Sequence, residues 1–412
     1  MARRRVVVTG MGAVTPLGLT VADTWAGLVG GKSGVALITH FDASRYSVRI
    51  AGEVKGFDPT RYMGFKEARR MARSSQLAIA AATDAMGDAG LGQEVPEPER
   101  SGVVIGSSAS GMNEVSVSYE IIKSKNRLSP FAFLASVPNM PAHHIGLLFR
   151  CLGYNATICT ACASGTQAIG EAAEVIRRGA ADLILAGGTE AFVNEISLAS
   201  FLSMRALACD NEHPERACKP FDARRDGFVT SEGSAVLVLE LLEKALDRGA
   251  PIYAEILGYG ATTDGFHAAQ PDPEGDGAAR AIRAALENAG TAPQEIDYVN
   301  THGTATPLGD AAETRAIKAV FGEHAYRLAL NSTKSMLGHL YGAAGAVETM
   351  ASIKQMWEGI LHPTINYEVP DPECDLDYVP NQARPVQVRA TLKNSFGLGG
   401  QNACLVLRRY EP

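Results

Sequence analysis

Cys162 is the first candidate for chemistry in this chain, because a helix-like segment follows it directly. Apolar residues recur at helical spacing over Ala163 to Arg178, and Gly179 then follows, as it does at many helix ends. A thiol at a helix N-terminus faces unpaired backbone N–H groups and the positive end of the helix dipole, which stabilise its thiolate. We therefore expect Cys162 to be an activated nucleophile. The alternative is a cysteine packed among small residues in the core, which is the commoner role.

Two histidines lie in distant segments that each follow an apolar, strand-like run. His302 comes after residues 296–299, and His339 comes after residues 328–330 and the intervening Lys334. The ends of strands are where α/β sheets present their chemistry, and a cysteine with histidines elsewhere in the chain is typical of nucleophilic catalysis. Alone, each histidine has a structural alternative, a hydrogen bond within a turn or a tightly packed helix. Together with Cys162 they favour catalysis.

Alternating strands and helices are needed to bring these residues together. The short apolar runs that we interpret as strands are residues 6–9, 103–106, 183–187, 236–239, 252–257, 296–299 and 405–407. Alanine-rich helical stretches such as Arg73 to Gly90 and Gly277 to Gly290 lie between many of them. This alternation predicts a layered α/β fold. Cys162 lies in residues 1–250 and both histidines lie in residues 251–412, so we expect two similar halves that meet at one site, although no repeat is evident in the sequence.

Composition excludes several classes of function. The 412 residues are 46% hydrophobic, which is ample for a large core, and the net charge of −7 argues against nucleic acid as a partner. No apolar run approaches the ~18 residues that would predict a membrane span. The apolar run at the N-terminus is too short for a signal peptide, and the seven cysteines fit free thiols better than disulfides or a zinc site. We therefore expect a cytoplasmic protein with no metal centre and no membrane contact.

The segment Gly10 to Thr15 has some likeness to a dinucleotide-binding fingerprint. Thr15 replaces the third glycine of the G-x-G-x-x-G pattern, and no acidic residue closes an obvious second strand. We expect a tight turn from strand to loop here. A nucleotide-binding oxidoreductase remains the alternative from another class of function.

Cys162, His302, Lys334 and His339, in this order, give the chain its resemblance to a known family. It resembles the β-ketoacyl-acyl-carrier-protein synthases of the elongating type, over nearly its whole length. The motifs that carry the resemblance are residues 7–12 (VVTGMG), 222–228 (DARRDGF) and 394–400 (NSFGLGG). It implies a thiolase fold, with two duplicated α/β halves in five αβαβα layers, and usually a homodimer.

The resemblance implies an acyltransferase that takes its substrates from an acyl carrier protein. An acyl group passes from carrier-bound phosphopantetheine to Cys162, and decarboxylation of malonyl-acyl carrier protein then gives a 3-ketoacyl product in fatty-acid elongation. The alternative is a type II polyketide or polyene ketosynthase, paired in a heterodimer with a chain-length factor. No cofactor is implied beyond a structural monovalent cation at most. A non-catalytic partner is disfavoured because Cys162 is present, and His339 stands where coenzyme A-dependent initiating synthases have Asn.

Residue roles in the reaction follow from the same resemblance. The backbone N–H groups of Cys162 and Leu398 would form one oxyanion hole. Neutral imidazoles of His302 and His339 would stabilise the enolate oxygen through Nε2. Lys334 would be enclosed and paired with Glu313. Residues 310–313 (DAAE) also fit a helix capping box led by an acid, so Glu313 has a local role as an alternative.

Substrate contacts are expected at Thr304 and Thr306, which would bind the pantetheine amides or else cap the turn before Pro307. Ala109 stands where a bulkier residue often narrows the acyl pocket, and Leu398 replaces the phenylalanine gate of fatty-acid relatives. We expect these two changes to admit long, branched or partly unreduced acyl chains.

A basic cluster is expected to hold the acidic carrier protein. Its residues match basic positions in relatives, and the alternative for each is a solvated helix face. The cluster consists of Lys66, Arg69, Arg70 and Arg205.

Overall fold

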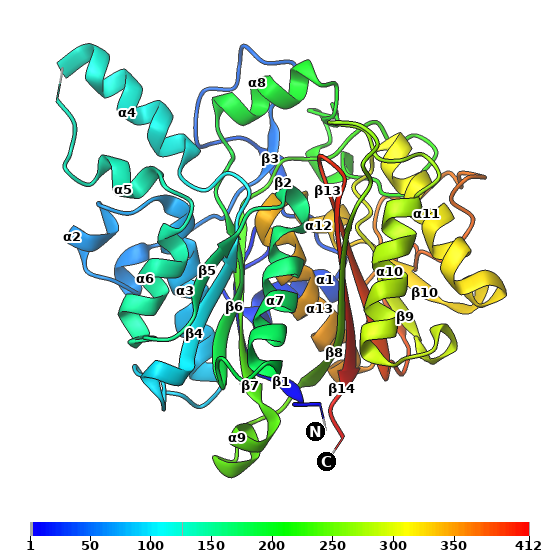
Figure 1. Ribbon diagram of the computed structural model, residues 1–412. Helices are drawn as coiled ribbons and strands as arrows, with labels where there is room; N and C mark the ends of the chain where they lie inside the picture. The colour runs from blue at the N-terminus through cyan, green and yellow to red at the C-terminus, as the bar shows by residue number, and fades with distance from the viewer. Residues whose placement is uncertain (1–2, 126, 412) are drawn as a thin grey trace.

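The computed structural model describes residues 3–125 and 127–411, and it arranges them in five layers (Figure 1). Two sets of strands lie on either side of a central pair of helices, α7 (Ser164–Arg177) and α13 (Ala344–Glu358). Helices α3 (Arg73–Asp88) and α6 (Met140–Phe149) cover the outer face of one set. The outer layer on the other side is built from α10 (Asp276–Ala289) and α11 (Pro307–Phe321). This is the predicted αβαβα arrangement.

The strands of the first half lie in the order β1-β7-β6-β4-β5. Strands β4, β5 and β6 run parallel to one another, while β7 is antiparallel to both β6 and β1. Their bounds are β1 Val6–Val14, β4 Ser101–Gly106, β5 Asn155–Ile158, β6 Leu183–Glu190 and β7 Gly233–Leu241.

The strands of the second half repeat this order as β8-β14-β13-β9-β10. We number the five large-sheet strands of each half from one to five along the chain. The order across the sheet is then first, fifth, fourth, second and third in both halves. Antiparallel pairing of β1 with β8, at Val7 with Glu255 and Val8 with Ala254, joins the two halves. The bounds are β8 Ala254–Thr263, β9 Tyr298–Asn300, β10 Ala329–Asn331, β13 Ala390–Gly397 and β14 Gln401–Arg409. The duplication that is not evident in the sequence is therefore plain in the topology.

Glycines in β1 and β8 carry a local trace of the duplication. A Cβ at Gly12 would lie 2.0 Å from the carbonyl oxygen of Ala81 in α3, and one at Gly260 would lie 2.4 Å from that of Ala281 in α10 (Asp276–Ala289). Each glycine lets a helix approach its strand closely. Gly10 and Gly12 thus lie inside β1, so the expected turn from strand to loop is wrong.

The expected helices agree with the structure to within a few residues, whereas β1 and β8 extend beyond the expected strands 6–9 and 252–257, to Val14 and Thr263. The helix expected from Ala163 begins as a 3-10 turn over Ala161–Ala163 and continues as α7. The remaining helices are α1 Val21–Val29, α2 Phe65–Ala68, α4 Met112–Lys125, α5 Ala132–Ser136, α8 Glu195–Ser203, α9 Leu242–Asp247, α11 Pro307–Phe321 and α12 Lys334–Leu337. Short strands are β2 Val35–Leu37, β3 Ile50–Gly52, β11 Ile360–Leu361 and β12 Arg384–Pro385. Among the described residues, no helix combines the length and apolar character that a bilayer span requires.

Candidate active site

A tight turn between β5 and α7 positions Cys162. Ala161 adopts a left-handed backbone with φ of 48°, and the Ser164 hydroxyl bridges the turn. Its Oγ donates to the carbonyl of Ala161 at 2.6 Å and accepts the N–H of Thr160 at 2.9 Å. Cys162 therefore lies at the start of α7, as predicted, with its side chain lining a cavity of about 720 Å³.

The protonation state of Cys162 differs from the expectation. Burial raises the pKa of the Cys162 thiol to about 11, against the opposing effects of the Leu398 N–H, the Lys334 ammonium and its own N–H. The helix start does favour the thiolate, but loss of solvation outweighs it. The expected resting thiolate is therefore wrong, and the sulfur is a thiol at neutral pH.

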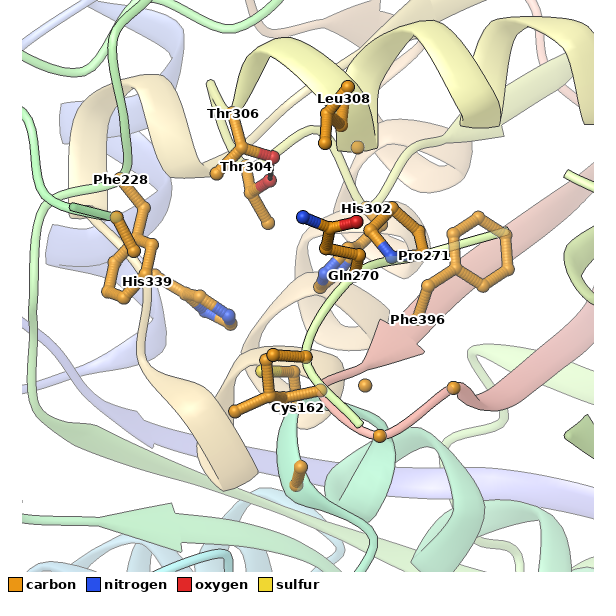
Figure 2. A pocket seen from close by; sticks show the side chains of 18 of the residues that line it. Cys162, Phe228, Gln270, Pro271, His302, Thr304, Thr306, Leu308, His339 and Phe396 are labelled. Carbon is orange, nitrogen blue, oxygen red and sulfur yellow. Dashed lines mark hydrogen bonds between the residues drawn. The ribbon is translucent and has the colours of Figure 1, made fainter. Parts of the chain in front are cut away.

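His302 and His339 face one another across the same cavity (Figure 2). His302 follows β9, and His339 follows α12, where its N–H donates to the carbonyl of Val229 at 2.7 Å. Their ring centroids are 5.5 Å apart and the rings are nearly perpendicular. Burial, and then the Lys334 charge, lower the pKa of both imidazoles well below the usual value. Both rings are therefore neutral, as expected.

Hydrogen bonds assign the tautomer of each ring. Nδ1 of His339 accepts the N–H of Tyr341 at 3.2 Å, and Nδ1 of His302 lies 3.4 Å from the Lys334 ammonium, which is only a donor. A neutral imidazole whose Nδ1 accepts carries its hydrogen on Nε2. In the described part of the chain, Nε2 of His339 is buried and has no partner. Both rings can therefore donate through Nε2, which is the geometry that an enolate oxygen needs.

Lys334 is enclosed as predicted, with 1% of its surface exposed. Its ammonium group donates to Glu348 Oε1 at 2.6 Å and to the carbonyl of His302 at 2.6 Å. The expected pairing with Glu313 is wrong, because Glu348 of α13 provides the carboxylate that touches the ammonium.

Glu313 instead fixes the turn that carries His302. Its two carboxylate oxygens accept the N–H groups of His302 and Gly303, each at 2.8 Å, and the Asn394 amide adds a third bond at 3.2 Å. Helix α11 begins at Pro307, with Thr306 as its N-cap residue. The expected capping box at residues 310–313 is wrong, since these residues lie inside the helix.

The remaining substrate-contact candidates converge on the cavity. Thr304 and Thr306 line it, and their hydroxyl oxygens lie 2.9 Å apart. Thr306 makes no side-chain cap bond within the described structure, so its hydroxyl is not committed to capping. Ala109 and Leu398 also line the cavity.

Leu398 occupies the hairpin turn between β13 and β14. The turn closes through a bond from the N–H of Gly400 to the carbonyl of Gly397, at 2.9 Å. Gly399 and Gly400 have φ of 88° and 78°, values that favour glycine. The Leu398 side chain is 44% exposed at the cavity, while its N–H is directed at the Cys162 sulfur. The two expected oxyanion donors are thus adjacent.

The basic cluster is divided in the structure. Arg205 lines the cavity, with a left-handed backbone at φ of 54°. Lys66, Arg69 and Arg70 lie in or next to α2, are exposed and do not line the cavity. Arg70 stacks on Phe131, with its guanidinium carbon 4.2 Å from the ring centroid.

Several residues of the site escape sequence reasoning. Glu348 and Lys393 complete the ion cluster at Lys334, and Tyr341 stacks on His339 with ring centroids 5.1 Å apart. The 3-10 turn Tyr341–Ala343 before α13 repeats the turn before α7, and Tyr341 has the same φ of 48° as Ala161. Only a comparison of the two halves in the structure reveals that these two turns correspond. The described residues contain no group of His, Cys, Asp and Glu side chains that could hold a metal ion.

Comparisons with known proteins identify the family of the chain. Residues 3–245 match the family model for the beta-ketoacyl synthase N-terminal domain, and residues 253–368 match that for the C-terminal domain. The chain is 46% identical over 411 residues to 3-oxoacyl-[acyl-carrier-protein] synthase 2 of Synechocystis sp., with 99% of each chain covered.

Two solved structures share the whole fold. The ishigamide ketosynthase/chain length factor has a TM-score of 0.93 at 37% identity, with 100% of both chains covered. AntDE:AntF, a type II polyketide synthase acyl-carrier protein in complex with its hexaketide-bound ketosynthase, has a TM-score of 0.92 at 34% identity. That match covers 99% of this chain and 100% of the other.

The fold and these comparisons together define a ketosynthase with a thiolase fold. The chain belongs to the beta-ketoacyl synthase family.

Proposed function

We propose that the protein is a 3-oxoacyl-acyl-carrier-protein synthase of fatty-acid elongation. It joins an acyl group, held as a thioester on Cys162, to malonyl-acyl carrier protein by decarboxylative Claisen condensation. The observation that carries this proposal is the pair of neutral imidazoles, 5.5 Å apart, at the cavity that Cys162 lines. The full-length likeness to the 3-oxoacyl synthase of Synechocystis supports the same reaction.

The first half-reaction is acyl transfer. The Cys162 sulfur attacks the thioester carbonyl of the acyl carrier, the bond to the pantetheine sulfur breaks, and the released pantetheine thiol takes up the proton that Cys162 loses. The N–H groups of Cys162 and Leu398, both directed at the sulfur, would hold the oxyanion. Because the resting sulfur is a thiol, this proton transfer accompanies the attack.

The second half-reaction forms the carbon–carbon bond. The bond between the malonyl methylene and its carboxylate breaks, carbon dioxide leaves, and the resulting enolate oxygen accepts hydrogen bonds from Nε2 of His302 and His339. The enolate carbon then attacks the acyl carbonyl, and the bond from that carbonyl to the Cys162 sulfur breaks. The released sulfur takes up a proton from solvent and so returns to the thiol. Neutral donors stabilise the enolate without being deprotonated by it. No metal or cofactor takes part in these steps.

Carrier-protein binding follows from the cavity and its surroundings. Thr304 and Thr306, whose hydroxyls bond to one another, would present the remaining hydrogen-bonding capacity of this pair to a pantetheine arm. Arg205 at the cavity offers charge to an acidic carrier. Exposed Lys66, Arg69 and Arg70 would extend that field. The polyketide relative in complex with its acyl-carrier protein supports a partner of this kind.

We propose that the protein forms a homodimer in the cytoplasm. Each chain consists of an N-terminal half, residues 1–250, and a C-terminal half, residues 251–412. Large apolar side chains are exposed on α4, α5 and α6, including Tyr119 at 58%, Phe133 at 73% and Leu147 at 70%. Exposed apolar surface of this extent is typical of an interface with another chain. Helix α4 projects from the body in Figure 1, so a second copy would cover it.

A polyketide or polyene ketosynthase is the second candidate. Leu398 at the gate and Ala109 in the pocket favour it, and so does the likeness to the ishigamide ketosynthase/chain length factor. In that case a chain-length factor would replace one copy in the dimer. Both assemblies are dimers, so the subunit composition of the complex isolated from the native cell, measured by mass spectrometry, distinguishes them.

Product analysis tests the proposed function. Purified protein is incubated with acyl- and malonyl-acyl carrier protein, and 3-ketoacyl-carrier protein is measured by mass spectrometry alongside carbon dioxide. We expect both products from the natural protein and no ketoacyl product from Cys162→Ala. Absence of ketoacyl product from the natural protein, across acyl chains of different length, would refute the proposal.

A further inference from the structure

A second lysine is buried next to the site, and neither half-reaction uses it. Lys393 lies in the middle of β13, between β9 and β14, where it is paired with Asn300 and Leu405. Its side chain is 0% exposed. A buried ammonium is costly unless it is paired and hydrogen-bonded, so its presence inside a central strand calls for a partner.

That partner is the carboxylate that already binds Lys334. Nζ of Lys393 lies 2.8 Å from Glu348 Oε2, while Nζ of Lys334 lies 2.6 Å from Glu348 Oε1. Lys393 also donates to Ser395 Oγ at 3.1 Å and to the carbonyl of Asn394. One carboxylate therefore bridges two ammonium groups, one from α12 and one from β13.

A second buried carboxylate, that of Glu313, is bound to backbone N–H groups. Glu313 is bound to the N–H groups of His302 and Gly303, so its charge is directed at the turn. Glu348 alone cannot neutralise two cations. The Lys334–Glu348–Lys393 cluster consequently carries a net positive charge beside His302, in a region where charges interact strongly because solvent is excluded.

We propose that Lys393 is a positioning residue of the condensation site. By sharing Glu348, it leaves the Lys334 charge incompletely neutralised and directed at His302, so that both imidazoles stay uncharged and the enolate meets a positive field. This inference rests on the proposed function. Ser395 Oγ, which Lys393 contacts, lies 2.7 Å from Thr166 Oγ1 in α7, so the same side chain also ties β13 to the helix of the nucleophile.

Titratable groups face Lys393 from every side. They are Glu348 on α13, Lys334 on α12, Glu313 on α11 and Cys404 on β14, with His302 and His339 beyond Lys334. Burial lowers the pKa of Lys393, and the ion pair with Glu348 opposes this. Lys393 and Lys334 both lower the pKa of the two imidazoles. Removal of the Lys393 charge should therefore raise both imidazole pKa values.

The test is the pH profile of condensation for Lys393→Gln, which removes the charge and keeps hydrogen-bond donors for Glu348 and Ser395. Since the neutral imidazoles are the active form, the acid limb should move to higher pH by about one unit. Lys393→Arg, which keeps the cation, should retain the original limb. Lys354→Gln removes a charge from a lysine that pairs with Glu358 on the surface of α13, and it is the matched control. It should leave the profile unchanged.

A purely structural role gives a different result. It would lower the rate equally at all pH values without moving the limb, and this would overturn the inference. Failure of both Lys393→Gln and Lys393→Arg to fold would also overturn it, because a positioning residue must be replaceable. The imidazole carbon shifts of His302 and His339, followed by NMR in histidine-labelled protein, report the same change in pKa without substrate. That readout separates failure of this inference from failure of the proposed function.

Discussion

The ammonium group of Lys334 donates a 2.6 Å hydrogen bond to the main-chain carbonyl of His302, and its Nζ lies 3.4 Å from Nδ1 of the same residue. One side chain thus holds the backbone of the His302 turn and assigns the tautomer of the ring. Glu313 holds the N–H side of the same turn. The position of His302 is therefore determined by two buried charges from different helices.

Removal of either histidine donor should affect condensation more than acyl transfer. For His302→Ala or His339→Ala we expect the condensation rate to fall by about 10²–10³, the usual cost of losing one oxyanion donor. Acylation of Cys162 should continue, because its oxyanion donors are backbone groups. Rates of ketoacyl formation and of Cys162 acylation are measured separately. The exposed His213 supplies the control His213→Ala, and equal loss of both rates in a histidine variant would contradict this division of roles.

Loss of the shared carboxylate should destabilise the protein. Glu348→Gln leaves two buried ammonium groups without a counter-ion, at a cost of about 3–5 kcal/mol in the free energy of unfolding. Thermal and urea unfolding measure this change. Glu358→Gln, which removes the partner of Lys354 on the same helix, should cost less than about 1 kcal/mol. Similar effects of the two substitutions would show that the cluster is not under strong electrostatic constraint.

Activity should persist below the usual pKa of histidine. Burial and Lys334 lower the pKa of His302 and His339, so the neutral, active form survives as the pH falls past about 6.5. The unfolded chain binds protons at these residues below that pH while the folded chain does not, so stability should decline as the pH falls further. Profiles of kcat/KM and of Tm between about pH 5 and pH 8, the range in which histidine titrates, check both statements. An acid limb centred at or above the usual histidine pKa would contradict the neutral pair.

The gate residue should set acyl selectivity. The natural protein is expected to use long, branched or partly unreduced acyl chains better than short saturated ones, because Leu398 is smaller than an aromatic gate. Leu398→Phe should lower kcat/KM for the larger chains by about tenfold, with a lesser effect on short chains. Leu246→Phe, an exposed position on α9, controls for added aromatic bulk. Equal or poorer use of the larger chains by the natural protein would refute the role of the gate.

The sequence alone singles out Cys162 and His302, because Cys162 lies at the start of a helix and His302 lies just after a strand. In a layered α/β fold such ends meet at one place. His339 lies farther from its strand, because the short helix α12 comes between β10 and this residue. The sequence does not identify which carboxylate pairs with Lys334. Glu348 and Glu313 are both on helices that approach Lys334, and only the packing of α13 against β13 selects Glu348.

The protonation state of Cys162 is also not predictable from the neighbouring sequence. A helix start favours a thiolate, and this effect can be read from the sequence. The opposing loss of solvation depends on the walls of the cavity, which come from distant segments of the chain. The duplication was hidden for a similar reason, since the two halves share strand order and glycine contacts more than residue types.

The most direct test of this account is the mass of the peptide that contains Cys162 after the protein meets acyl-acyl carrier protein without malonyl substrate. We expect this peptide to gain the mass of the acyl group, and to lose that mass when malonyl-acyl carrier protein is added and ketoacyl product forms. An acyl group on another residue, or ketoacyl product from Cys162→Ala, would contradict it.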